Sequence, residues 1–201
     1  VSGHHPSPFP HSDSVMTTLQ KTLRGAKGAV AFCRHAHAKA LNRAVFPGVM
    51  AHATGAQLLA KAICFGEVGQ PSFKALMERV VRNAQRLAGA LADRGYALVS
   101  GGTQTHLMIV DVRSKGLTGK DAERRLQAGG ILANKQLIPA DPEKPTVCSG
   151  IRLGTPCSAS RGMGEPEMDQ VAGLIDRLIG GEDPAGVRAE VAELADSFPL
   201  P

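Results

Sequence analysis

Lys21 is the residue of this sequence whose surroundings best suit covalent chemistry. It follows a threonine-rich, β-prone run at 14–19, and it precedes a turn that contains Gly25 and Gly28. A lysine amine forms a Schiff base with a carbonyl when it is partly desolvated. Glycines let the backbone approach a bound ligand closely. A lysine in an ordinary surface turn has the same neighbours, so this stretch alone fits both a Schiff-base lysine and a turn lysine.

The histidines and cysteines do not have the spacing of a metal site. His4, His5 and His11 lie in a proline-rich segment that fits no tetrahedral template, so no metal is expected. The four cysteines form no CxxC pair and stand in largely apolar stretches, which predicts buried free thiols rather than disulfides or zinc ligands. They are Cys33, Cys64, Cys148 and Cys157.

The composition of the 201 residues is that of an ordinary soluble globular protein, with 43% hydrophobic and 20% charged residues. No apolar run has transmembrane length, and residues 1–13 lack the features of a signal peptide, so the expected location is the cytoplasm. The formal net charge is +5, but the basic residues are dispersed and aromatic residues make up only 3%. We therefore expect anionic small molecules or an acidic partner, and neither nucleic acid nor a membrane.

Turn residues and apolar periodicity predict alternating strands and helices, and hence an α/β fold. The clearest helix is expected over 72–94, where one apolar stripe lies between the N-cap Ser72 and Gly95. Low polarity predicts burial of a helix over 53–66 and of the strand at 28–33. Further strands are expected at 96–100, 106–112, 131–134 and 149–154, and further helices over 119–128, 165–179 and 185–196.

Several blocks of this sequence together resemble the serine hydroxymethyltransferase (glycine hydroxymethyltransferase) family. The segment "HPSPFPHSDSVMTTLQKTLRGAKGAVAF" resembles that family's pyridoxal phosphate (PLP) lysine segment. Other blocks follow in family order: "FPGV", "AKAICFGE", "VVRNAQRLAGALADRGYALVSGGTQTHLMIVDVR", "GLTGKDAE", "GILANKQLIP" and "SGIRLGTP". The resemblance spans nearly the whole chain and corresponds to about the C-terminal half of a family chain.

The resemblance implies a fold-type-I PLP-dependent transferase. Residues 1–70 would be the end of the PLP-binding large domain, and residues 71–201 the small C-terminal α/β domain, entered by the long helix. The family implies pyridoxal 5′-phosphate as cofactor, tetrahydrofolate as co-substrate, serine and glycine as substrates, and a dimer or tetramer. The family's other contacts to the ring, the phosphate and folate lie upstream, so a complete site is expected to need a further N-terminal half.

Three candidate residues match family positions directly. Lys21 falls on the Schiff-base lysine, Thr18 on a threonine near the reacting centre, and Arg152 on the arginine that binds the amino-acid carboxylate. A planar guanidinium suits a carboxylate, although a surface arginine at a strand end is the other interpretation of Arg152. Gln20 replaces the histidine before the lysine; it keeps hydrogen-bonding capacity but cannot titrate near neutral pH.

Other family positions carry replacements. Ala51 and His52 stand where the family has paired glycines, whose N–H groups bind the PLP phosphate of the neighbouring subunit. The His52 side chain could contact that phosphate itself or face solvent. The family's folate contacts fall on Gln136, which replaces an asparagine, and on Lys144, Pro145 and Thr146.

Three functions follow from these matches and replacements. The first is the activity of a serine hydroxymethyltransferase. The second is that of a catalytically silent homologue or half-enzyme, which acts as a structural partner. The third is that of a relative that transfers another aldehyde onto glycine. Residues 1–50 are expected to be late strands of a parallel sheet, whose apolar faces and edges must be covered. The covering chain would be a second copy or a complementary N-terminal chain.

Overall fold

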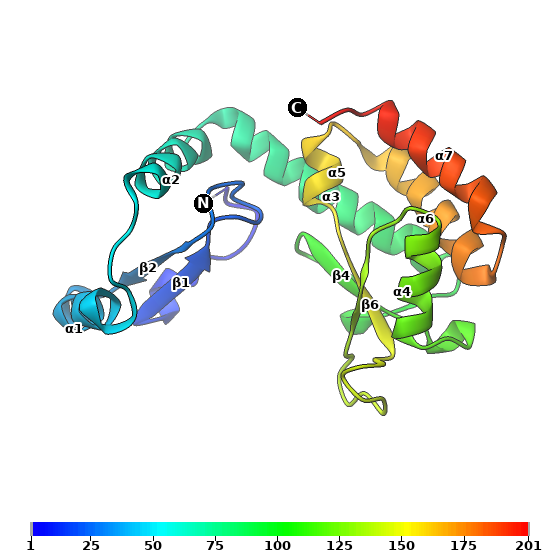
Figure 1. Ribbon diagram of the computed structural model, residues 1–201, viewed down its shortest axis with the longest axis horizontal. Coiled ribbons are helices and arrows are strands. Elements are labelled where there is room, and N and C mark those ends of the chain that lie inside the picture. The colour runs from blue at the N-terminus through cyan, green and yellow to red at the C-terminus, as the bar shows by residue number, and fades with distance from the viewer. Residues whose placement is uncertain (1, 201) are drawn as a thin grey trace. The chain divides into compact units, whose positions relative to one another are not determined.

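A computed structural model describes residues 2–200 of the protein. The chain forms two compact units, Val1–Ala75 and Leu76–Pro201, called here the N-terminal and the C-terminal unit (Figure 1). Helix α3, Pro71–Ala92, runs from the first unit into the second. Strands and helices are present in both units, so the chain is an α/β protein, as the sequence predicts.

The N-terminal unit is built from a β-hairpin and two helices. Strand β1, Ser14–Thr18, pairs antiparallel with β2, Ala29–Cys33, so that Ser14 lies opposite Cys33. The prediction of parallel strands in this part of the chain is therefore wrong for the described residues. Helix α1, Ala38–Arg43, was not predicted, and an irregular turn at Ala44–Val49 follows it, in which Phe46 and Pro47 depart from helical backbone angles. Helix α2, Gly55–Val68, begins with a capping box at Thr54 and is confirmed.

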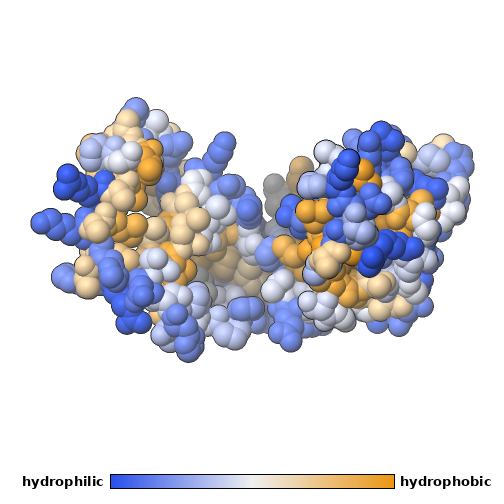
Figure 2. Space-filling view, turned by 90° about the horizontal axis from the view of Figure 1, so that it is seen from below, coloured by the Kyte–Doolittle hydropathy of each residue, from blue (hydrophilic) through white to orange (hydrophobic). Residues whose placement is uncertain are grey.

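Apolar side chains of the N-terminal unit are largely exposed. The predicted burial of α2 is wrong, because Cys64 is its only buried residue and Leu59 and Ile63 are 64% and 56% exposed. The predicted burial of β2 is also wrong, since Phe32 is 42% exposed. Figure 2 shows hydrophobic residues, in orange, at the surface of the molecule. A two-stranded hairpin is marginal by itself, so this unit needs further contacts for independent stability.

The C-terminal unit contains an antiparallel four-stranded sheet in the order β3-β4-β6-β5. Its strands are β3 Ala97–Leu98, β4 Leu107–Asp111, β5 Asn134–Gln136 and β6 Gly150–Gly154. Its remaining helices are α4 Gly119–Ala128, α5 Pro156–Ser160, α6 Glu165–Gly180 and α7 Pro184–Asp196. Short 3-10 turns occur at Phe9–His11, His35–His37, Val99–Gly101 and Arg113–Lys115.

One face of this sheet packs on the helices. Buried side chains alternate along β4 and β6, and they form one hydrophobic core with α3, α4 and α6. Met108, Val110, Ile151 and Leu153 face this core. The intervening residues, among them Arg152, therefore lie on the opposite face of the sheet.

Local sequence signals predict α3, α4, α6 and α7 of this unit well, but they miss α5 and predict one strand poorly. Helix α4 has the predicted bounds, because the Thr118 side chain accepts a hydrogen bond from Asp121 N and glycines follow Ala128. The strand predicted at 131–134 begins only at Asn134, since the Ile131 N–H bonds to Leu126 O and completes the end of the helix.

The cysteines are free, as predicted, but they are not all buried. Cys64 and Cys148 are buried, Cys33 is half-buried and Cys157 is exposed. Among residues 2–200 no helix is long and apolar enough to cross a membrane.

Candidate functional site

The loop between β1 and β2 carries Lys21 and is closed by backbone hydrogen bonds. Leu19 N donates to Gly28 O at 3.0 Å, and Gly25 N donates to Leu19 O at 2.8 Å. Arg24 N donates to Lys21 O at 2.8 Å, which makes a tight turn immediately after the lysine. The Leu19 side chain is fully buried, whereas Lys21 is exposed. The lysine therefore projects from an ordered backbone, and its desolvation has to come from a ligand or another surface.

Helix α2 packs directly behind this loop, and at Gly25 it leaves room only for glycine. A Cβ at Gly25 would lie 2.6 Å from Cys64 Sγ, and one at Gly28 would lie 2.9 Å from Lys61 Cε. Gly28 also has a φ of 152°, which favours glycine. The proximity of Lys61 to the loop was not predicted from the sequence.

Cys64 anchors the contact between α2 and the loop. Its thiol donates to Leu23 O at 3.3 Å. Burial raises the pKa of Cys64, and Glu67 raises it further while Arg24 lowers it. The thiol is therefore a packing group that supports the lysine loop.

Gln20 and Thr18 flank the loop. The Gln20 side-chain oxygen accepts a hydrogen bond from Gly28 N at 3.3 Å. Gln20 thus braces the loop that carries its neighbour Lys21. Thr18 ends β1 and is half-buried, and its carbonyl accepts a bond from the Thr17 hydroxyl at 3.3 Å.

Ala51 and His52 lie in the segment between the turn at Ala44–Val49 and α2, and both are exposed. Within residues 2–200 the His52 ring makes no hydrogen bond or ion pair, so it is available to a ligand. Their role at a phosphate remains a prediction.

The open face of the sheet brings Arg152 and Gln136 onto neighbouring strands. Arg152 lies opposite Ile109 on β4 and opposite Asn134 on β5. Because side chains alternate along a strand, Gln136 points to the same face as Asn134 and Arg152. Arg152 is exposed, and in the described part of the chain its guanidinium has no hydrogen-bond or ion-pair partner. Sequence reasoning missed Asn134, which follows directly from the strand register.

The other three candidate folate residues lie in the connection from β5 to β6. Lys144, Pro145 and Thr146 are exposed there. Lys144 O accepts hydrogen bonds from Val147 N at 2.8 Å and Cys148 N at 2.9 Å, so this turn has a defined backbone.

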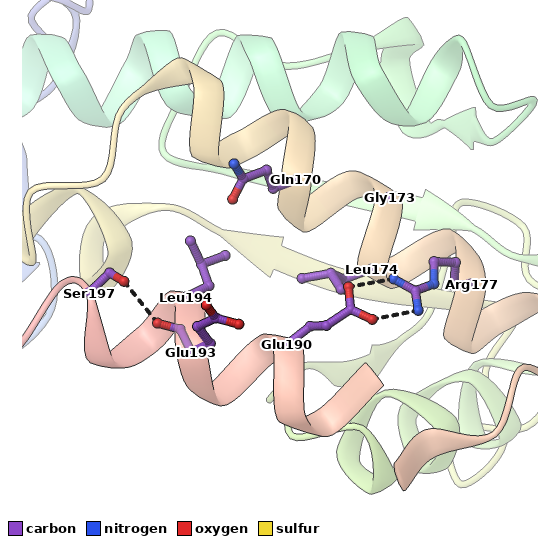
Figure 3. A pocket seen from close by; sticks show the side chains of 8 residues that line it. All are labelled: Gln170, Gly173, Leu174, Arg177, Glu190, Glu193, Leu194 and Ser197. Atoms are coloured by element: carbon purple, nitrogen blue, oxygen red, sulfur yellow. Dashed lines mark hydrogen bonds and ion pairs between the residues drawn. The ribbon is translucent and has the colours of Figure 1, made fainter. Parts of the chain in front are cut away.

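A pocket between α6 and α7 contains none of the predicted site residues. Figure 3 shows the Arg177 guanidinium facing Glu190 across it. Two guanidinium nitrogens of Arg177 each donate to a carboxylate oxygen of Glu190 at 2.7 Å. Arg177 also bonds Glu182 at 2.6 and 2.9 Å. Because the charge of Arg177 is already balanced, this cluster is best explained as the attachment of α7 to the core.

These observations define an α/β protein with a lysine on a braced loop and an unpaired arginine on an open sheet face. A protein-family model described as "Serine hydroxymethyltransferase" matches residues 1–175. The chain therefore belongs to the serine hydroxymethyltransferase family. Membership supports a PLP-dependent, serine hydroxymethyltransferase-like function at the level of the family.

The residues present fit the aldehyde end of PLP. Lys21 offers an exposed amine without a hydrogen-bond partner among residues 2–200, on a loop that α2 supports. Ala51 and His52, the residues expected at the phosphate, carry Cβ atoms where the family has glycines, and the exposed His52 ring could donate a hydrogen bond there.

Proposed function

We propose that the protein takes part in the interconversion of serine and glycine, with tetrahydrofolate as the one-carbon carrier. The observation that carries this proposal is Lys21 on its braced loop within the matched region 1–175. PLP, when bound, supplies an electron sink that stabilises negative charge at the substrate Cα. Lys21 binds the aldehyde of the cofactor, and Gln20 keeps the loop closed through Gly28.

Arg152 binds the carboxylate of the amino acid in this proposal. Its unpaired guanidinium can form two parallel N–H···O bonds to a carboxylate, which fixes orientation as well as affinity. Gln136 on the same sheet face and residues 144–146 bind the reduced folate.

We further propose that another protein surface, belonging to a second copy or to a complementary chain, completes the site. The outward side of α2 supports this, because Leu58, Leu59, Ile63 and Phe65 are all at least 45% exposed. Large contiguous apolar surfaces on soluble proteins usually mark interaction sites. The inward side of the same helix, which carries Cys64, is occupied by the lysine loop.

The test is PLP binding followed by turnover, for the chain alone and with a candidate N-terminal half. The wild type should shift the absorbance band of PLP and form glycine from serine in the presence of tetrahydrofolate. Lys21→Ala should abolish both, whereas Lys27→Ala, an exposed lysine on the same loop, should retain both. Absence of a shifted band in every mixture would overturn the enzymatic proposal.

Two other functions have specific observations in their favour. The side chains at Ala51 and His52 favour a silent homologue, which would bind its partner but no PLP. The engagement of Gln20 with Gly28, where the family has histidine, favours transfer of another aldehyde onto glycine. Association with the partner chain in the absence of PLP would identify the silent homologue. Glycine-dependent consumption of an aldehyde in the absence of tetrahydrofolate would identify the enzyme that transfers another aldehyde.

A further inference from the structure

A single carboxylate closes the connection between β5 and β6. Asp141 Oδ2 accepts hydrogen bonds from Ile138 N at 3.1 Å and Ser149 N at 2.9 Å. Its Oδ1 accepts bonds from Glu143 N at 2.9 Å and the Ser149 hydroxyl at 2.6 Å. Ile138 follows β5 closely and Ser149 immediately precedes β6, so Asp141 joins the two ends of the loop.

The tip of this loop depends on the closed base. Cys148 is buried with a φ of 59°, a left-handed conformation that is costly for a residue other than glycine. Its thiol donates to Pro145 O at 3.1 Å, and its N–H donates to Lys144 O. The strained residue next to Ser149 therefore supports the tip residues 144–146 directly.

The base of the loop is also joined to the core. Cys148 O accepts a bond from Gly119 N at 2.8 Å, and Ser149 O accepts one from Val112 N at 3.0 Å. Ser149 is 1% exposed. The loop base therefore has a fixed position relative to β6 and Arg152.

The charge of Asp141 suits this role. Partial burial alone would raise the pKa of Asp141, but the hydrogen bonds from Ser149, Glu143 and Ile138 together lower it well below the usual aspartate value. Aspartate consequently accepts all four bonds as the ionised carboxylate at neutral pH.

We propose that Asp141 is a positioning residue for the folate: it holds residues 144–146 in the conformation that binds a reduced folate, at a fixed place relative to Arg152. The folate part of this inference rests on the proposed function. Asp141 acts through the loop and does not itself contact the ligand.

The experiment compares Asp141→Asn with wild type and with Glu143→Gln. The asparagine keeps the size of the side chain but can accept bonds on only one of its two terminal atoms. Glu143 is a matched control because it neighbours Asp141 and, in the described region 2–200, its carboxylate has no hydrogen-bond partner. Asp141 lies outside the hydrophobic core, so the variant should fold.

Two measurements are made on each protein, loaded with PLP and mixed with the completing half: amide hydrogen exchange at residues 147–149, and binding of 5-formyltetrahydrofolate and of glycine by calorimetry. Asp141→Asn should speed the exchange and weaken folate binding by about tenfold each, since charge-assisted hydrogen bonds are lost. Glycine affinity should not change, because Arg152 is held by the β4 and β5 ladders. Glu143→Gln should behave as wild type.

Unchanged exchange in Asp141→Asn would overturn the role of Asp141 in holding the loop. Faster exchange with unchanged folate affinity would show a structural role only and overturn the positioning role. If the wild type binds no reduced folate, the folate part of the inference and the proposed function both fail, while the exchange data still decide whether Asp141 holds the loop.

Discussion

Replacing Gly25 with alanine tests whether α2 fixes the Lys21 loop. The new Cβ would lie 2.6 Å from Cys64 Sγ, 3.0 Å from Cys64 Cβ and 3.3 Å from Leu19 O. Non-bonded carbon contacts are most favourable at about 3.5–4.0 Å, so the overlap with sulfur is about 1 Å. Overpacking of this kind costs about 1–3 kcal/mol, which we expect as local destabilisation of the loop.

A second substitution identifies the source of this cost. Cys64→Ala removes the sulfur but leaves its Cβ at 3.0 Å, so relief should be partial. We expect the double variant to be about 1 kcal/mol more stable than the sum of the single effects predicts. Gly66→Ala is the matched control, because a Cβ there has no atom within 4 Å, and it should stabilise α2 by up to about 1 kcal/mol.

The assay is native-state hydrogen exchange at the amides of Leu19, Arg24 and Gly25, which close the loop. Gly25→Ala should speed exchange at all three and weaken PLP binding. Unchanged exchange, or an equal effect of Gly66→Ala, would refute the close packing between the loop and α2.

Three further predictions concern separate contacts. Gln20→Ala should speed amide exchange at Gly28, which loses its acceptor; an unchanged rate would mean that the bond is not formed. Leu59→Glu on the outward side of α2 should weaken association with the completing surface, measured by sedimentation, without loosening the lysine loop; unaltered association would exclude this surface. Hydrogen bonding from Lys135 N–H and the Lys135 ammonium lowers the pKa of Glu123 from 4.5, so its stabilising effect is present at neutral pH and is lost as pH falls through the lower value. The free energy of unfolding, measured by denaturation at several pH values across this range, should therefore change less with pH in Glu123→Gln than in the wild type. The same pH dependence in both proteins would contradict this prediction.

Local signals predicted α3, α4, α6 and α7 because the ends of these helices are determined by neighbouring residues, whereas the short helix α5 was not predicted. Thr118 and the glycines after Ala128 define α4 in the sequence as they do in the structure. The position of β5 depends instead on pairing with β6, where Asn134 lies opposite Arg152, and this long-range register is not encoded locally.

Burial in the N-terminal unit was predicted wrongly, because the apolar composition of a segment does not determine which surface packs against it. The apolar composition of α2 correctly predicted a helix, but only Cys64 is buried by the described residues. Composition predicts which side chains favour burial, whereas their actual burial depends on tertiary contacts that the local sequence does not encode.

The sequence predicted the charged residues of the candidate site but not the residues that support them. Lys21 and Arg152 came from the family resemblance, and their roles stay predictions. Asp141 was missed although it stands in a proline-flanked turn, where an aspartate commonly binds nearby backbone N–H groups. Lys61 could be found only from the packing of α2 on Gly28.

The most direct test of the account is to locate bound PLP on the chain. The protein is incubated with PLP, alone and with a completing half, then reduced with borohydride and mapped by mass spectrometry of its peptides. The account predicts a pyridoxyl group on Lys21 that is absent from Lys21→Ala, with Lys27 and Lys61 unlabelled. Equal labelling of Lys27 or Lys61, or labelling retained in Lys21→Ala, would contradict the assignment of Lys21 as the cofactor lysine.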